Sequence, residues 1–197
     1  MDKGEWRRTM KALRAAAADR AARDAAICTN LLSLPQFGGA RNILLYRPVG
    51  TEASPLAAAE QLQRRGKNIF YPRVLGKEML PVRDRGLGFA AGAFGIQEPV
   101  GEAEDLSPDI VVLPMLAADR QLYRLGYGGG YYDRYLARRP QALRIGICYS
   151  FQLADRLPAE PHDLPLHILV TDGETLFSPS YQWRDHESTQ SSRLGDR

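Results

Sequence analysis

Short apolar runs, most of them closed by proline or glycine and separated by helix-length segments, constrain the fold of this chain more than any other feature of its sequence. Such runs are typical of strands buried in a parallel sheet, with the intervening helices covering its faces. The predicted strands are Asn42–Tyr46, Asn68–Tyr71, Ile110–Leu113, Arg144–Cys148 and Ile168–Thr171, then an Asp172-Gly173 hairpin turn and a strand at Thr175–Phe177. Pro72 should end the second strand. We therefore expect a single α/β domain over residues 1–178, three-layered and Rossmann-like, whose mostly parallel sheet is flanked by helices on both faces.

The helices are predicted from composition and from their end signals. Lys3–Leu34 is rich in alanine, arginine and leucine, which favours helix with a break near Asp19. Ser54–Gly66 begins with Ser-Pro, a cap followed by a first-turn proline, and ends at glycine. Tyr131–Arg139 has helical character up to the next proline. By contrast, Leu75–Pro99 carries glycines, alternating charges and short apolar pieces, so small strands and loops are expected there in an arrangement that the sequence leaves open.

Composition narrows the class of protein. A net charge of +3 is too small to indicate a nucleic-acid partner. The sequence has neither an apolar leader nor a membrane-spanning run, and it has only two cysteines, so we expect a cytoplasmic protein with free thiols and no membrane partner. The three histidines lack the spacing of a zinc site. Residues 179–197 are polar and are predicted to be a disordered tail, and a monomer is favoured.

The Arg124–Arg134 segment, Arg-Leu-Gly-Tyr-Gly-Gly-Gly-Tyr-Tyr-Asp-Arg, contains four glycines in five positions. Glycine inside a helix or strand costs about 0.5–1 kcal/mol, so this cluster indicates a loop in which successive N–H groups can turn toward an anion. The flanking tyrosines, arginines and aspartate supply stacking faces, cations and a metal-seeking carboxylate. The loop fits neither the Walker nor the dinucleotide pattern. Placed directly after the Ile110–Leu113 strand, it would lie at the ligand-binding edge of the sheet; the alternative is a tight strand-to-helix connection.

Several blocks together resemble the 5-formyltetrahydrofolate cyclo-ligase family, also called methenyltetrahydrofolate synthetase. They occur in the family's order from about residue 3 to residue 173. The blocks are Lys3 with Arg7, Glu52 after the first strand, Phe94-Gly-Ile-Gln-Glu-Pro99, Arg124–Arg134, and Leu157-Pro-Ala-Glu-Pro-His-Asp163.

The resemblance implies a NagB/RpiA/CoA transferase-like fold and an enzyme that closes 5-formyltetrahydrofolate to 5,10-methenyltetrahydrofolate. ATP is the co-substrate, Mg²⁺ is the cofactor, and ADP and phosphate are released. The γ-phosphoryl group would be transferred to the formyl oxygen, which turns that oxygen into a leaving group when N10 attacks. Positioning and charge stabilisation matter more in such a step than a protein nucleophile.

Residue roles also follow from the resemblance. Arg124 would be catalytic, as a charge clamp on the transferring group, and Glu52 would bind the polar edge of the pterin. Asp133 and Asp163 would hold the metal. ATP binding would involve Lys3, Arg7, Arg124, Leu125, Gly126, Tyr127, Gly128, Gly129, Gly130, Tyr131 and Tyr132, and the last two tyrosines would also contact the folate.

Each role has an ordinary structural alternative when the residue is considered alone. Lys3 and Arg7 are one helical turn apart and could simply face water on a helix. Asp133 could cap the helix that begins nearby, the two tyrosines could be core residues, and Glu52 could face solvent.

The chain departs from the family's usual pattern near the loop. Leu122 stands where a glycine is common, two residues before Arg124, and Ala118 replaces an aromatic residue. Some relatives have cationic side chains at the positions of Tyr127 and Gly129, so phosphate contacts from those two positions do not transfer. The differences at Leu122 and Ala118 bear on the conformation of the loop and not on the chemistry.

Two other functions remain open at this point. One is a folate- or nucleotide-binding module without turnover, although such a module has no need of aligned magnesium ligands. The other is a sugar-phosphate isomerase of similar α/β architecture, because fold alone does not determine function.

Overall fold

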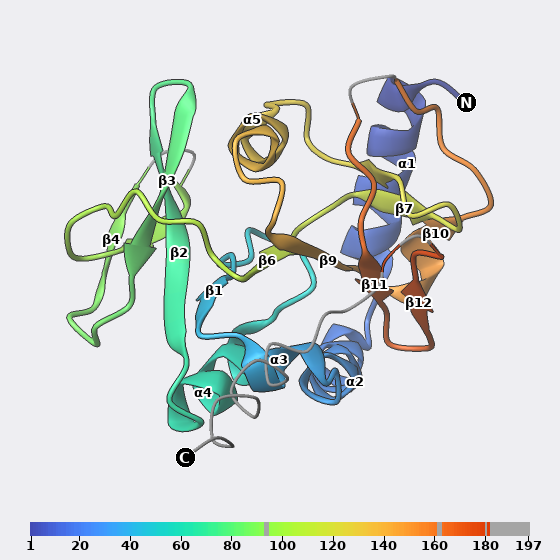
Figure 1. Cartoon of the computed structure of the whole chain (residues 1–197). Helices are drawn as coiled ribbons and strands as arrows, with labels where there is room; N and C mark the ends of the chain where they lie inside the picture. The colour runs from blue at the N-terminus through green and yellow to red at the C-terminus, as the bar shows by residue number, and fades with distance from the viewer. Residues whose placement is uncertain (93–94, 161–162, 180, 182–197) are drawn as a thin grey trace, which may run out of the picture.

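The computed structural model describes residues 1–92, 95–160, 163–179 and 181, and its centre is a seven-stranded sheet in the order β12-β11-β9-β6-β1-β2-β3 (Figure 1). Strands β11, β9, β6, β1 and β2 are parallel, and antiparallel β12 and β3 form the two edges. The strands are β1 (Asn42–Leu44), β2 (Asn68–Leu75), β3 (Glu78–Arg83), β6 (Ile110–Leu113), β9 (Leu143–Ile147), β11 (Ile168–Val170) and β12 (Thr175–Phe177).

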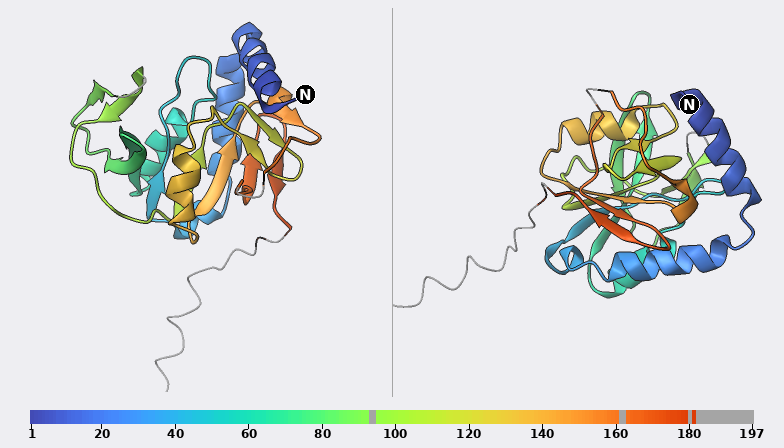
Figure 2. Two further views of the ribbon diagram at one scale, coloured as in Figure 1. Left: turned by 90° about the horizontal axis from the view of Figure 1, so that it is seen from above. Right: turned by 90° about the vertical axis from the view of Figure 1, so that its right-hand side faces the viewer.

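Helices cover both faces of this sheet, as the right-hand view of Figure 2 shows. Successive residues of β6 enter different cores: Ile110 and Val112 pack with α2 (Arg20–Leu32), α3 (Gln36–Gly39) and α4 (Leu56–Arg64), whereas Val111 and Leu113 pack with α5 (Tyr131–Ala137). This alternation is the one expected of a strand buried between two layers. The predicted three-layer α/β fold is confirmed.

A small second sheet and α1 (Lys3–Ala16) form a third apolar cluster beside the main sheet. This sheet contains β10 (Leu153–Ala154), β7 (Ala117–Asp119) and β8 (Arg124–Leu125), and Met10 of α1 packs against it. The prediction that the glycine-rich loop directly follows β6 is therefore wrong, because the β7–β8 hairpin intervenes. The Ala-Ala-Asp strand has little intrinsic strand propensity and is held by pairing with β8 and with β10, which is distant in sequence.

The predicted break in the first helical segment is confirmed. Asp2 caps α1 by accepting from the Glu5 amide, α1 ends at Ala16, and α2 begins after Asp19. The start of α4 is less regular than predicted, because its cap residue is Pro55, and the Ser54 hydroxyl lies 3.5 Å from the Leu56 amide nitrogen.

The prediction that Pro72 ends the second strand is wrong. Pairing of β1 with β2 does stop near it: the Leu45 amide donates to Phe70, and Pro72 has no N–H to extend that ladder. The other side of the same strand continues to Leu75, with Pro72 directly opposite Pro81 of β3.

The small strands expected in the following segment are present as β3 and as the β4–β5 hairpin (Phe89–Ala91 and Gln97–Pro99). The family block that begins at Phe94 starts on a residue outside the described ones.

The end of the described chain folds back on the sheet. β12 pairs with β11 after the predicted Asp172-Gly173 turn, and the Tyr181 ring stacks on His167 with centroids 4.6 Å apart. Residues 180 and 182–197, most of the predicted disordered tail, lie outside the described residues. Earlier in the chain, a 3₁₀ turn at Ser150–Gln152 precedes β10.

Candidate active site

A cavity of about 700 Å³ opens at the carboxyl ends of the parallel strands. Tyr46, Arg47 and Glu52 line it from the segment after β1, and Pro114 lines it directly after β6. β1 lies between β2 and β6 in the sheet. The chain builds outward from β1 to β2 and β3 on one side, and later from β6 to β9 and β11 on the other, so the cavity lies at the point where the strand order reverses. Open α/β sheets bind ligands at such switch points.

The cavity brings together every site residue predicted from the sequence, from Lys3 and Arg7 on α1 to Asp163 near the end of the domain. Sequence reasoning missed a second set of lining residues. Several of these directly follow a predicted strand, a position that could have revealed them, whereas Met79 and Ile96 carry no local signal. The second set is Tyr46, Arg47, Val49, Pro72, Val74, Met79, Ile96, Pro114, Glu160 and Leu164.

Cations gather where α1 meets the cavity. Lys3 Nζ lies 3.0 Å from Asp163 Oδ2 and 3.1 Å from Glu160 Oε1. Burial lowers the pKa of Lys3, but its hydrogen bonds to these two carboxylates outweigh burial, and the pKa is raised. Arg7 Nε donates to the Gly126 carbonyl at 3.0 Å, which ties α1 to the glycine-rich loop. These two cations therefore face the cavity and not bulk solvent.

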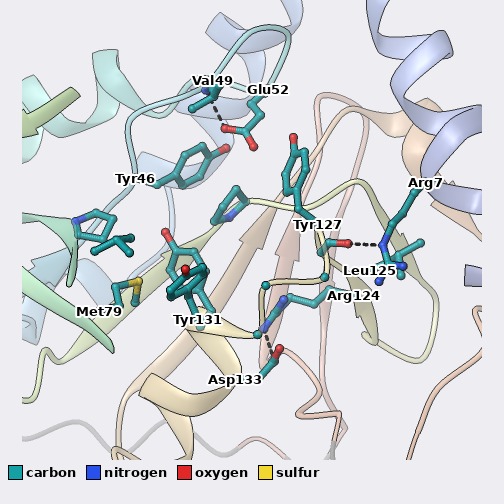
Figure 3. Close-up of a pocket in the computed structure, with 18 of the residues that line it drawn as sticks. Arg7, Tyr46, Val49, Glu52, Met79, Arg124, Leu125, Tyr127, Tyr131 and Asp133 are labelled. Carbon is teal, nitrogen blue, oxygen red and sulfur yellow. Dashed lines mark hydrogen bonds and ion pairs between the residues drawn. The ribbon is translucent and has the colours of Figure 1, made fainter. Parts of the chain in front are cut away.

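The predicted clamp and a predicted metal ligand are partners in this structure. Arg124 donates to the Asp133 carboxylate (Figure 3), and the Arg124 side chain is 7% exposed. Asp163 likewise accepts from Lys3. Within the described ranges there is no group of three or more histidine, cysteine, aspartate or glutamate residues arranged to hold a metal ion.

The glycines of the loop are needed for its backbone conformation and its close contacts. Gly128 and Gly130 have φ of +99° and +66°, a region that residues with a side chain rarely adopt. A Cβ at Gly129 would lie 2.9 Å from the Tyr131 ring. The amides of these three glycines donate no hydrogen bond within the described part of the chain. They lie at the surface of the cavity and are not packed into a core, which favours the anion-binding interpretation of the loop.

A carboxylate and aromatic rings form the other end of the cavity. Glu52 Oε2 accepts from the Val49 amide at 2.8 Å, and the Tyr46 and Tyr127 hydroxyls point toward the Glu52 carboxylate (Figure 3). Burial, and then the charge of Glu52, raises the pKa of Tyr132, while the charge of Arg124 opposes the rise. Tyr132 therefore lies within electrostatic reach of both ends of the cavity.

Leu122 explains one departure from the family's pattern. Its φ is +68°, and it is the one non-glycine residue with positive φ in the described ranges. The side chain is buried in the core between α5 and the sheet. Leucine thus adopts a left-handed turn at this position, and the β7–β8 hairpin delivers Arg124 to the cavity.

Comparison with known proteins identifies the family. The model of the 5-formyltetrahydrofolate cyclo-ligase family matches residues 1–172. A Schizosaccharomyces pombe protein named probable 5-formyltetrahydrofolate cyclo-ligase is 29% identical over 166 residues, 74% of this chain and 81% of that protein. The Escherichia coli K12 protein named 5-formyltetrahydrofolate cyclo-ligase is 28% identical over 153 residues, 73% of this chain and 84% of that protein.

Two solved structures have the same fold. The Aquifex aeolicus 5,10-methenyltetrahydrofolate synthetase is similar with a TM-score of 0.80 and 33% identity, covering 96% of this chain and all of that one. A Mycoplasma pneumoniae 5,10-methenyltetrahydrofolate synthetase is similar with a TM-score of 0.73 and 28% identity, covering 87% of this chain and 99% of that one. The motif-based prediction is confirmed, and the chain belongs to the 5-formyltetrahydrofolate cyclo-ligase family.

Proposed function

We propose that this chain closes 5-formyltetrahydrofolate to 5,10-methenyltetrahydrofolate at the expense of ATP, in the cavity at the strand switch point. The observation that carries the proposal is the meeting of two kinds of surface in one cavity. Cations and exposed glycine amides lie at one end, and Glu52 with tyrosine rings lies at the other. The first suits a triphosphate, and the second suits a flat heterocycle with N–H donors.

The reaction makes a formamide oxygen leave. That oxygen attacks the γ-phosphorus of ATP, the bond to the bridging oxygen breaks, and ADP leaves with its electron pair. The formyl carbon is then an electrophilic iminium centre. N10 of the same folate attacks it and loses its proton, and the C–O bond breaks to release phosphate. The protein's task is to hold two reactants in line and to stabilise charge.

The nucleotide end contains the groups for this task. Lys3 and Arg7 would bind phosphate oxygens from α1, and the amides from Gly126 to Gly130 would cradle them. Arg124 would stabilise the charge that develops on the transferring group. Only one Arg124 nitrogen is hydrogen-bonded to Asp133, and a guanidinium has five N–H donors, so donors remain for phosphate.

Magnesium fits the donor set. Mg²⁺ in nucleotide sites is commonly held by one or two carboxylates together with substrate phosphates. Asp133 and Asp163 both line the cavity and would supply those carboxylates. When bound, the ion would neutralise triphosphate charge. In this structure Arg124 and Lys3 hold these two carboxylates at the cavity through ion pairs.

The folate end would use Glu52 and two tyrosines. The Glu52 carboxylate would accept the N–H groups of the pterin edge, because one of its oxygens is already oriented by the Val49 amide. Tyr131 and Tyr132 line the cavity beside the loop, where a ring can lie against the pterin or the formyl group.

Absorbance of the conjugated methenyl product tests the proposal directly. Incubation with ATP, Mg²⁺ and 5-formyltetrahydrofolate should give product that grows through many turnovers. A binding module without turnover would instead bind both ligands stoichiometrically and form no product. Product formation without ATP consumption would contradict the phosphorylation step.

Location and assembly are also proposals. We propose a cytoplasmic enzyme, supported by the reduced state of Cys28 and Cys148, both buried as free thiols. No described helix is long and apolar enough to cross a membrane. We further propose a monomer that binds two small molecules, which size-exclusion chromatography with light scattering would test.

A further inference from the structure

Helix α1 lies along the glycine-rich loop through one face. Lys3, Arg7, Lys11 and Arg14 are spaced by four, four and three residues, which places them on the same side of a helix. Lys3 contacts Asp163, and Arg7 contacts the loop. Lys11 Nζ lies 5.5 Å from the centre of the Tyr127 ring. The family resemblance accounts for the first two cations. It gives no role to Arg14.

Arg14 is a buried cation that contacts the loop. Its residue is 4% exposed, its Nη2 donates to the Tyr127 hydroxyl at 2.7 Å, and its Nη1 donates to the Met115 carbonyl at 3.4 Å. Its Nε is buried without a hydrogen-bond partner among the described residues, and Arg14 forms no ion pair with a described carboxylate. Burying a charge with incomplete pairing is costly. Fold stability alone is therefore a poor reason for an arginine at this position.

The contact with Arg14 determines which hydrogen bonds the Tyr127 hydroxyl accepts and which it donates. Arginine only donates, so the tyrosine oxygen accepts, and its own proton is left to be donated on the cavity side. There the hydroxyl points toward Glu52 (Figure 3). Burial, and then the neighbouring Glu52 carboxylate, raises the pKa of Tyr127, with Arg14 opposing, so the hydroxyl keeps its proton at neutral pH.

Glu52 and Tyr127 thus present acceptors and a donor side by side. A reduced pterin has a matching edge, in which an amino N–H and a ring N–H stand next to a carbonyl oxygen. We propose that Tyr127, positioned by Arg14, is a folate-specificity residue whose hydroxyl donates to that carbonyl oxygen while Glu52 accepts the adjacent N–H groups. This inference rests on the proposed function and deepens it. It places Tyr127 on the folate side of the cavity, whereas the family resemblance assigns it to ATP.

The first test is Tyr127→Phe, which removes the hydroxyl and keeps the ring. Calorimetric titration with 5-formyltetrahydrofolate, without ATP, should give a dissociation constant raised about fivefold to tenfold, as expected for one lost hydrogen bond. The Michaelis constant for ATP should stay within about twofold. Arg8→Met, on an exposed position of the same helix, is the matched control and should change neither constant. A raised ATP constant with unchanged folate affinity would overturn the assignment.

The second test asks whether Arg14 acts through Tyr127. Arg14→Met should weaken folate binding by a similar factor. Adding it to Tyr127→Phe should weaken binding no further, because both changes remove the same hydrogen bond from Tyr127 to the folate. Fully additive losses would show that Arg14 does not position Tyr127. If Arg14→Met does not fold, the decision rests on the ligand comparison below, which needs Tyr127→Phe alone.

The third test changes the ligand. Folate and its 4-amino analogue differ at the carbonyl oxygen that Tyr127 is proposed to bind and in the hydrogen on the adjacent ring nitrogen, so the change caused by Tyr127→Phe isolates the hydroxyl's share of the preference. The unchanged protein should be inhibited by the 4-oxo form at a lower concentration than by the 4-amino form. The ratio of the two inhibitory concentrations, 4-amino over 4-oxo, should be about fivefold smaller in Tyr127→Phe. A ratio that Tyr127→Phe leaves unchanged would refute the contact. Failure of the proposed function would look different, since the unchanged protein would then form no methenyl product.

Discussion

Because the backbone of Leu122 is left-handed, we expect glycine at this position to give a more stable protein than alanine, the reverse of the usual order. The residue has φ of +68° and is only 3% exposed, its N–H donates to the Asp119 carbonyl, and its own carbonyl accepts from the Leu166 amide. A left-handed conformation costs a residue with a Cβ about 1–2 kcal/mol. Burial of the leucine side chain offsets this, because truncating a buried leucine to alanine costs about 2–5 kcal/mol.

Two truncations separate these contributions. Leu122→Ala and Leu122→Gly both lose the buried side chain, but only the alanine keeps a Cβ in the left-handed region. Glycine gains back that strain of about 1–2 kcal/mol and loses about 0.4–1 kcal/mol through the greater entropy of its unfolded chain. We therefore expect Leu122→Gly to be the more stable of the two by about 0.5–1 kcal/mol, with both less stable than the unchanged protein.

Thermal unfolding followed by circular dichroism is the assay. For a chain of this size 1 kcal/mol corresponds to about 2–4 °C, so Leu122→Gly should melt about 1–4 °C above Leu122→Ala. Leu136, equally buried in the same core but in helix α5, is the control: there glycine should be about 1 kcal/mol worse than alanine. The same order at both positions would refute the argument that Leu122 is strained.

Three changes in the cavity have distinct kinetic consequences. Arg124→Ala should lower kcat by about a hundredfold or more while folate affinity stays within a few-fold, because the charge is needed as the phosphoryl group moves; an unchanged kcat in steady-state assays would remove Arg124 from that role. Tyr132→Ala should raise the Michaelis constant for folate more than that for ATP, and the reverse would move the ring to the nucleotide end. Arg7→Met should raise the Michaelis constant for ATP about tenfold with little change for folate, measured by the same assay.

The sequence predicts the main sheet well, apart from the placing of β3, because its other strands each have a local signal. Ile110–Leu113 is an uninterrupted apolar run ended by proline, and it is a strand of those bounds. The prediction that Pro72 ends β2 was wrong because the missing N–H of proline affects one edge of the strand and not the other. The Ala117–Asp119 strand was missed because its stability comes from partners about 7 and 35 residues away. Local propensity carries no information about such pairs.

The cavity shows the same division. Residues inside sequence motifs, such as Arg124 and Asp133, were found from the sequence and line one cavity, although their mutual ion pair was not anticipated. Arg14 was not found, since an arginine on an alanine-rich helix usually faces water. Only the docking of α1 on the loop shows that this side chain is buried and bonded to Tyr127.

The ion pair between Arg124 and Asp133 implies an exchange of partners when nucleotide and metal bind. With Mg²⁺ present, Asp133 would turn to the ion and Arg124 to phosphate, so both charges stay paired. Without Mg²⁺, the same phosphate would meet an unneutralised carboxylate, and each such close repulsion costs about 1 kcal/mol or more in a partly exposed site. Asp133→Asn removes the repulsion together with the proposed metal ligand. Calorimetric titration of the variant should therefore show ATP binding that is a few-fold weaker than in the unchanged protein with Mg²⁺ and a few-fold tighter with a chelator. Weakening by the same factor under both conditions would mean that Asp133 orients Arg124 and does not bind the metal.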